Sequence, residues 1–205
     1  MAESIEIQIL NRIKKAKRGV PFFAKSFITI GTQDAVRQAL VRLVKTKELQ
    51  RVATGIYVRP QIDRIIGKIT PGIEAIAKGI AKRDKARIVP TGLYALNRLG
   101  LSTQMPTNII YLTDGAARKI KIGNRHITFK KATPRNVAAV GEISRLCIQA
   151  LREIGKDHVT EDEIKKIQHV LLKEKPTRLE HDIRLAPVWI REIMRPVLKK
   201  LQHDY

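Results

Sequence analysis

The chain has 205 residues, of which 43% are hydrophobic and 29% charged, and its 40 lysines and arginines against 19 acidic residues give a net charge of +21. This apolar content can form hydrophobic cores, which excludes wholesale disorder, and so basic a balance points to polyanions such as nucleic acid or an anionic membrane surface. The lone Cys147 excludes an intramolecular disulfide framework and a cysteine-based zinc site. No run approaches the roughly 18 apolar residues of a membrane span, and Glu3 and Glu6 interrupt the N-terminal stretch, so we expect a soluble cytoplasmic protein without a signal peptide or membrane partner.

The positive charge is concentrated in the first two thirds of the chain. Residues 1–60 hold 12 basic and 4 acidic side chains, residues 61–135 hold 15 and 4, and residues 136–205 hold 13 and 11. The predicted elements differ between the same three segments. We therefore expect a winged helix-turn-helix, then a small α+β domain, then a helical C-terminal region that packs on the second domain or extends it, and the fold class is α+β.

Residues 1–60 carry the element order of a winged helix-turn-helix. The patterns predict a helix over 4–17, a brief helix over 22–27, a longer helix that opens at Thr32, and a β-hairpin over 49–58. Thr32 can cap the free N–H groups of the longer helix, and apolar residues at three- and four-residue steps define its buried face. In such modules this helix lies in the major groove of DNA and the hairpin touches the backbone or the minor groove.

The polar face of the longer helix supplies candidate contacts to double-stranded DNA. Arg37 and Arg42 can each form two hydrogen bonds with guanine or bind phosphate, and Gln33 or Gln38 can pair with adenine. Phosphate contacts are expected from Thr32 at the helix N-terminus, Arg51 and Arg59 of the hairpin, and Lys14 and Lys15 after the first helix. The alternative is a solvated basic face on a winged helix that binds protein.

Residues 61–135 begin with a connector over 61–72 and then read as an α+β domain with a small, mainly antiparallel sheet. Helices are predicted over 73–85 and 91–99, and strands over 87–90, 108–113, 119–122 and 125–129. Gly123-Asn124 is a strong hairpin signal between the last two strands. The lysines and arginines of this segment could extend a DNA surface, bind RNA or an acidic protein, or be a solvated face.

Residues 136–205 show helical patterns only, with helices predicted over 137–154, 161–173 and 187–202. Thr160 and Glu163 form a capping box at the start of the second helix. Cys147 is expected to be buried, Trp189 to anchor a core or an interface, and Glu180-His181-Asp182 to make polar contacts at the surface.

Signatures of catalysis are sparse. The chain has no phosphate-binding G-x-x-x-x-G-K-[ST] loop, no G-x-G-x-x-G and no G-x-S-x-G, and its five histidines lack metal-ligand spacing. Glu161, Asp162, Glu163 and Lys165 resemble a nuclease motif, but that chemistry needs carboxylates on a sheet edge, whereas here they open a helix. We therefore expect no cofactor, no metal and no enzymatic activity, with a metal-dependent nuclease as the enzymatic alternative.

Two stretches of residues resemble one protein family. Val36-Arg37-Gln38-Ala39-Leu40-Val41-Arg42-Leu43 and Leu49-Gln50-Arg51-Val52-Ala53-Thr54-Gly55-Ile56-Tyr57-Val58-Arg59-Pro60 resemble the N-terminal winged helix of AbiEi-type antitoxins. Pro90-Thr91-Gly92-Leu93-Tyr94-Ala95-Leu96-Asn97-Arg98-Leu99-Gly100-Leu101, with Thr113-Asp114-Gly115, looks like their second domain. The resemblance covers about residues 4–135, and nothing is carried over to the helical tail.

The resemblance implies an antitoxin of the bacterial type IV toxin–antitoxin and abortive-infection systems. Its winged helix would bind an inverted repeat in its own promoter and repress the operon, through Thr32, Gln33, Arg37, Gln38, Arg42, Arg51 and Arg59. Its second domain would help to counter a nucleotidyltransferase-like toxin without a stable complex. The alternative within the same fold is an unrelated winged-helix regulator whose second domain senses a ligand or a partner.

Overall fold

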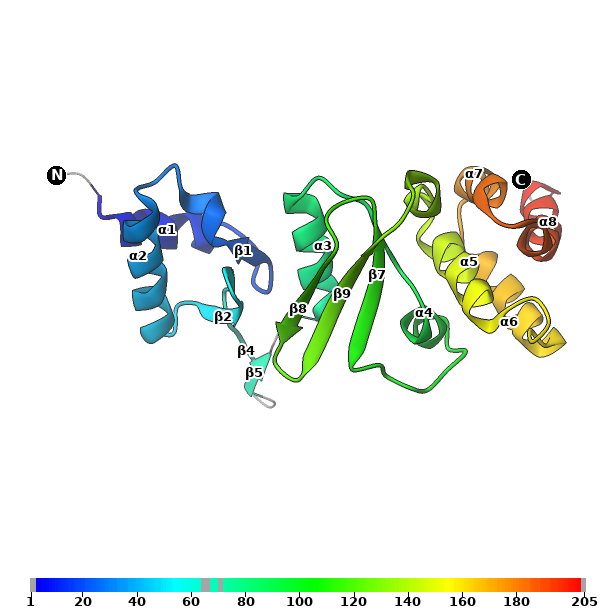
Figure 1. Ribbon diagram of the computed structural model, residues 1–205, viewed down its shortest axis with the longest axis horizontal. Coiled ribbons are helices and arrows are strands. Elements are labelled where there is room, and N and C mark those ends of the chain that lie inside the picture. The colour runs from blue at the N-terminus through cyan, green and yellow to red at the C-terminus, as the bar shows by residue number, and fades with distance from the viewer. Residues whose placement is uncertain (1–2, 64–66, 70–71, 204–205) are drawn as a thin grey trace. The chain divides into compact units, whose positions relative to one another are not determined.

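The computed structural model describes residues 3–63, 67–69 and 72–203, and its architecture is α+β, as the sequence predicts (Figure 1). Contacts between Cα atoms group the chain into two compact units. The first unit is Met1–Asp84 with Ile120–Asn124, and the second is Lys85–Lys119 with Arg125–Tyr205.

The first unit begins with a winged helix. Its elements are α1 (Ile5–Lys14), β1 (Pro21–Phe23), the 3-10 helix η1 (Ala24–Phe27), α2 (Gln33–Lys45), β2 (Gln50–Ala53) and β3 (Ile56–Val58). The three strands form an antiparallel sheet in the order β1-β3-β2, so the hairpin predicted over 49–58 is present and has an additional edge strand.

Strand β1 corrects the prediction of one brief helix over 22–27. Pro21, Phe22 and Phe23 pair with Val58, Tyr57 and Ile56, and only the following four residues turn into a helix. An edge strand tolerates Pro21 at its first position because a missing N–H there removes no central ladder bond. Helix periodicity could not reveal β1, since its partner strand lies more than 30 residues further along the chain.

Helices α1 and α2 bury their apolar faces against each other. Ile9 and Ile13 of α1, and Ala39 and Leu40 of α2, have no exposed surface. The Thr32 Oγ1 atom accepts a hydrogen bond from the Ala35 N–H (3.3 Å), which confirms Thr32 as the N-cap of α2. Because the apolar side of α2 is used in this core, its polar side faces outward.

The rest of the first unit was only partly predicted. The expected connector contains a two-stranded antiparallel ladder of β4 (Gln61–Asp63) and β5 (Gly67–Ile69). Helix α3 (Ile73–Arg83) packs on β1, where a Cβ atom at Gly79 would overlap the Pro21 side chain. The Arg83 guanidinium lies 4.4 Å from the centroid of the Phe23 ring. These contacts explain why α3 groups with the winged helix rather than with the residues that follow it.

The second unit is built on a four-stranded sheet in the order β6-β7-β9-β8. Its elements are β6 (Ile88–Pro90), α4 (Leu93–Arg98), β7 (Asn108–Thr113) and β9 (Arg125–Lys131), and the sheet is completed by β8 (Arg118–Ile122), of which residues 120–122 group with the first unit. Strands β6 and β7 are antiparallel, but β7 and β9 are parallel, which the sequence did not predict. The pair is parallel because the Gly123-Asn124 turn places β8 at the sheet edge and returns β9 beside β7.

Aromatic packing and one ion pair fix this sheet internally. The Tyr111 ring lies 6.0 Å from the Phe129 ring of the neighbouring strand and 6.2 Å from the Tyr94 ring of α4, measured between centroids. At the end of β7, Asp114 accepts hydrogen bonds from the Arg87 backbone N–H (2.7 Å) and from Arg87 Nε (2.8 Å). The side-chain bond and then the backbone bond lower the pKa of the Asp114 carboxyl below its ordinary value.

The C-terminal part of the second unit is helical. Its elements are η2 (Pro134–Val137), α5 (Glu142–Ile154), α6 (Glu161–Leu171), α7 (Pro176–Leu185) and α8 (Val188–His203). Helix α7, which was not predicted, starts with Pro176 in its first turn, a position that proline favours. The predicted capping box of Thr160 and Glu163 and the burial of Cys147 are confirmed, and desolvation raises the pKa of this thiol to about 12. Among the described residues, no helix has the length and apolar character to cross a membrane.

Candidate nucleic-acid interface

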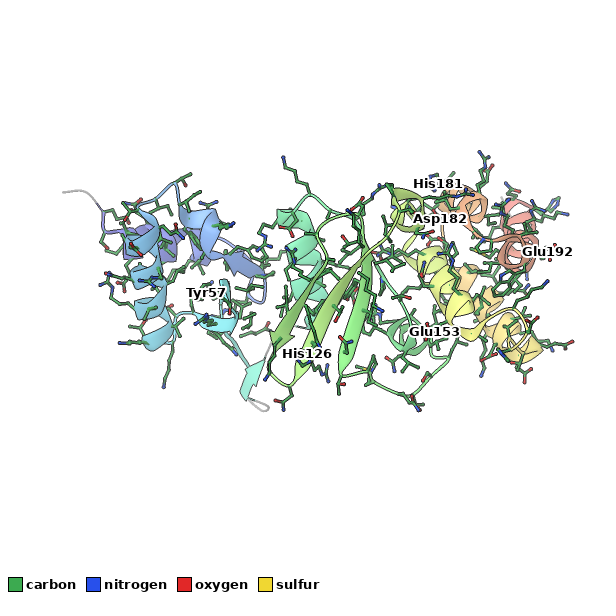
Figure 2. All side chains as sticks on the ribbon, in the orientation of Figure 1. Tyr57, His126, Glu153, His181, Asp182 and Glu192 are labelled. Carbon is green, nitrogen blue, oxygen red and sulfur yellow. The ribbon has the colours of Figure 1, made fainter. Side chains whose placement is uncertain are left out.

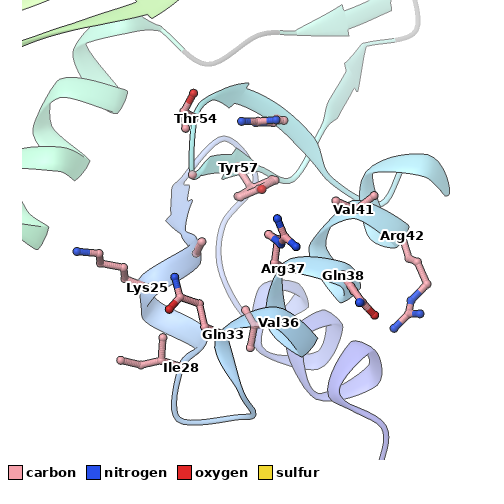
Figure 3. Close-up of a pocket in the computed structure, with 13 residues that line it drawn as sticks. Lys25, Ile28, Gln33, Val36, Arg37, Gln38, Val41, Arg42, Thr54 and Tyr57 are labelled. Atoms are coloured by element: carbon pink, nitrogen blue, oxygen red, sulfur yellow. The ribbon is translucent and has the colours of Figure 1, made fainter.

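A groove of about 1010 Å³ lies between the polar side of α2, the helix η1 and the β2–β3 wing (Figure 3). All of its walls come from the first unit. It is lined by Ala24, Lys25, Ile28, Gln33, Val36, Arg37, Gln38, Val41, Arg42, Arg51, Thr54, Gly55 and Tyr57. Four of these residues are basic and none is acidic, so the groove carries positive charge.

Helix α2 supplies one wall by its periodicity. Gln33, Arg37 and Val41 follow at four-residue steps, which places them in a single row on the outer side of the helix. Gln38 and Arg42 form the neighbouring row. Figure 3 shows these side chains projecting from α2.

The wing supplies the opposite wall. Arg51 of β2 is directly across from Tyr57 of β3, so the two side chains share one face of the hairpin. Tyr57 is only 6% exposed and forms part of the base of the groove. The turn at Thr54-Gly55 depends on glycine, because Gly55 has a φ of 69°, a left-handed conformation that other residues rarely adopt.

The two α2 arginines are held differently. Arg37 pairs with Asp34 at 3.5 Å, but both side chains are more than 70% exposed, so water screens this pair and the guanidinium is free to exchange partners. Arg42 donates from Nε to Glu6 Oε2 of α1 at 2.9 Å. Arg42 therefore links α2 to α1, and Glu6 offsets part of its charge.

Five of the nine residues predicted to contact DNA line the groove, and four do not. The lining residues are Gln33, Arg37, Gln38, Arg42 and Arg51. Thr32 caps α2 just before the first of them. Arg59 donates a hydrogen bond of 3.4 Å to the Lys14 carbonyl at the end of α1, where Lys14 and Lys15 are both exposed to solvent.

Sequence reasoning missed several lining residues. Lys25 and Ile28 reach the groove from η1 and the residue after it, and Thr54 and Tyr57 reach it from the wing. Val41 could have been noticed in the sequence, because this aliphatic residue falls outside the apolar spacing of Val36, Leu40 and Leu43. It is 47% exposed and Ile28 is 60% exposed, so aliphatic surface adjoins the arginines.

The other polar clusters considered from the sequence have structural roles. The Glu163 carboxylate accepts from the Thr160 N–H (2.9 Å) and hydroxyl (3.0 Å), so it belongs to the helix cap. Asp182, which lies on α7 (Figure 2), was expected at the surface. It has no exposed area. It accepts hydrogen bonds from the Val140 and Gly141 N–H groups (both 2.8 Å) and from the Ser144 hydroxyl. No cluster of metal-ligating side chains occurs in the part of the chain that the structure describes.

Comparison with known proteins places the chain in a family. The model of a family of unknown function (DUF6088) matches residues 8–179, from within α1 to within α7. No match among curated proteins was found. Because the matched segment covers most of the 205 residues, the chain belongs to the family of unknown function DUF6088.

Proposed function

We propose that the protein is a transcriptional regulator that binds double-stranded DNA and acts by binding rather than by catalysis. The observation that carries the proposal is the groove between α2 and the wing, lined by four basic residues and no acidic one among the described side chains. An α-helix fits the major groove of B-DNA, which is about 12 Å wide. The elements on either side of this groove are the ones that read DNA in winged-helix modules.

The proposal assigns different tasks to the groove residues. Gln33 and Arg37 stand in the outer row of α2 and read base edges, since glutamine pairs with adenine and arginine with guanine. Arg42 contacts phosphate while it stays hydrogen-bonded to Glu6. The free N–H groups at the start of α2, next to Thr32, bind a further phosphate.

The simplest test is selection from a random duplex pool by the full chain, followed by measurement of the affinity for the enriched sequence. We expect one sequence motif to be enriched, with affinity that falls as salt rises. A pool that stays random, or equal affinity for the enriched and a scrambled duplex, would contradict DNA reading by α2.

Within this proposal, the narrower role is that of an antitoxin that represses its own operon through an inverted repeat and counters a nucleotidyltransferase-like toxin. It rests on the resemblance of residues 36–60 and 90–101 to AbiEi-type antitoxins. A toxin of this class encoded directly downstream, whose growth arrest is relieved by co-expression of this chain, would support it. A regulator whose second unit senses a ligand is the second candidate, and the arginine-lined cavity of that unit, described below, favours it.

Replacing both Lys14 and Lys15 by glutamine is expected to weaken binding to the selected and the scrambled duplex by the same factor. Both side chains are exposed at the end of α1 and outside the groove, where they would contact phosphates only. The slope of log K against log salt concentration should become shallower by about one to two units. Lys173→Gln, an exposed site in the second unit, is the control, and loss of affinity for the selected duplex alone would contradict a phosphate role.

Val41 is expected to recognise thymine, because its exposed methyl groups stand in the same row of α2 as Gln33 and Arg37. Apolar side chains in the major groove contact the 5-methyl group of thymine. Substituting deoxyuridine for single thymines of the selected duplex should weaken binding by the native chain at one or two positions, and Val41→Ala should abolish that difference. Val140→Ala changes a similarly exposed valine of the second unit, and it should preserve the difference in affinity between the thymine and the uridine duplexes. Equal binding of all the uridine duplexes by the native chain would refute this role.

A further inference from the structure

A small half-open cavity in the second unit is lined by three arginines and no acidic residue. Its walls are Arg135, Asn136, Ala139, Arg145, Ile148, Gln149, Arg152 and Leu185. Arg145, Gln149 and Arg152 follow at spacings of four and three residues along α5, so they share one face of that helix. Arg135 and Asn136 come from η2, and Leu185 ends α7.

One buried polar atom in the lining of this cavity has no hydrogen-bond partner within the described part of the protein. Gln149 is only 4% exposed and lines the cavity. The Nε atom of Arg145 is buried and lacks a hydrogen-bond partner among the described residues. Buried amides and guanidinium groups normally have partners, because an unpaired buried donor carries a desolvation cost.

The charges of the three arginines are only weakly compensated by acidic side chains. Arg145 pairs with Glu142 at 3.7 Å, and the Glu142 side chain is 71% exposed. Among the described residues, neither Arg135 nor Arg152 forms an ion pair. Burial lowers the pKa of the Arg152 guanidinium, as expected for a cation partly removed from water.

We propose that this cavity is a binding site for a dianionic phosphate group, either inorganic phosphate or a phosphomonoester. The charged side chains of the lining are all arginines, which donate hydrogen bonds and accept none. Three guanidinium groups favour an anion with two negative charges over a carboxylate, which has one. The cavity has a volume of about 10 Å³, which is room for one oxygen atom. One phosphate oxygen enters the cavity, and the guanidinium groups of its lining bind the remaining oxygens.

The proposal is independent of DNA binding by the first unit, and it gives the second unit a ligand-sensing role. The test uses the full chain, with thermal unfolding and calorimetric titration at fixed ionic strength, in which phosphate replaces chloride. Inorganic phosphate, a nucleoside monophosphate and a duplex without terminal phosphates are the three probes. The first two distinguish free phosphate from a phosphomonoester as the source.

We expect phosphate or the monophosphate to raise the Tm of the native chain, because a ligand that binds only the folded state stabilises it. Arg152→Gln should weaken this binding by about tenfold, since it removes charge-assisted hydrogen bonds. Gln149→Leu, which keeps the volume but removes the amide, should leave the Tm without phosphate unchanged or higher and should abolish the rise. Arg178→Gln removes the same charge from an exposed site on α7 and should bind as the native chain does.

Two results would overturn the site. One is a Tm that does not respond to either phosphate probe beyond chloride of equal ionic strength, or that responds only to the duplex. The other is a full response in Arg152→Gln, which is the informative variant if Gln149→Leu fails to fold because Arg152 is only half-buried.

Discussion

Asp182→Ala is expected to lower the free energy of unfolding of the second unit by about 3–5 kcal/mol. The substitution removes the acceptor of the buried Gly141 N–H and Ser144 hydroxyl and of the partly buried Val140 N–H. Gly141 is the N-cap of α5 and has no side chain to cap the helix, so the first turn of α5 depends on carboxylates from elsewhere. Glu174 supplies the other, because it accepts from the Ile143 (2.8 Å) and Ser144 (3.2 Å) N–H groups.

The single tryptophan provides the measurement. Trp189 packs against the helical core of the second unit, so its fluorescence reports the unfolding of that unit in urea. Asp157→Ala, an exposed acidic residue between α5 and α6, should change the stability by no more than about 0.5 kcal/mol. Asp182→Asn keeps one acceptor oxygen but points an amide group at N–H donors. Its loss of stability should therefore lie between those of Asp182→Ala and Asp157→Ala. A loss below 1 kcal/mol in the alanine variant, on the scale of an ordinary surface change, would mean that the carboxylate does not hold α5.

Arg37→Ala is expected to weaken binding to the selected duplex by about 1–3 kcal/mol, which is roughly 5- to 150-fold. Arg37 lines the groove in the outer row of α2, and its exposed ion pair with Asp34 is screened by water. It can therefore turn toward a guanine at little cost. Arg42→Ala should have a smaller effect on sequence preference, because Glu6 already holds that side chain.

The affinities of the native and variant chains for the selected and the scrambled duplex separate base reading from charge. Arg37→Lys keeps the charge but loses the planar guanidinium group, which can donate two parallel hydrogen bonds to guanine. The variant should therefore bind the scrambled duplex normally and the selected duplex weakly. Arg178→Ala is the matched control on a helix of the second unit. Unchanged affinity for the selected duplex in both the Arg37 and the Arg42 variants would remove α2 as the recognition helix.

Local patterns in the sequence predicted the elements that local chemistry decides. The Thr32 cap with its apolar stripe, the hairpin around Gly55 and the capping box of Thr160 and Glu163 are all in place, since each depends on residues within one or two turns. The polar row of α2 was predicted for the same reason. These signals were enough for the fold class and for one wall of the groove.

Features that depend on distant partners could not be predicted. Strand β1 forms only because it can pair with β3. Strand β9 is parallel to β7 only because β8 occupies the edge of the sheet. Asp182 belongs to a polar tripeptide that is typical of a surface. It is buried nevertheless, and it accepts a hydrogen bond from the Gly141 N–H at the start of α5. Likewise, Ile28 and Tyr57 line the groove, but helix or strand periodicity in the sequence does not show where their segments lie relative to α2.

The edge position of β8 gives a physical reason for part of the positive charge outside the winged helix. An unpaired edge strand offers its backbone N–H and C=O groups to any other extended chain, which is a route to aggregation. Lys119 and Lys121 alternate along β8 and are both exposed at this edge. A second copy of the chain that paired with this strand edge to edge would bring like charges together. These lysines therefore disfavour self-association through β8. This repulsion needs no nucleic acid, so it gives these two basic residues a role that does not depend on a polyanion.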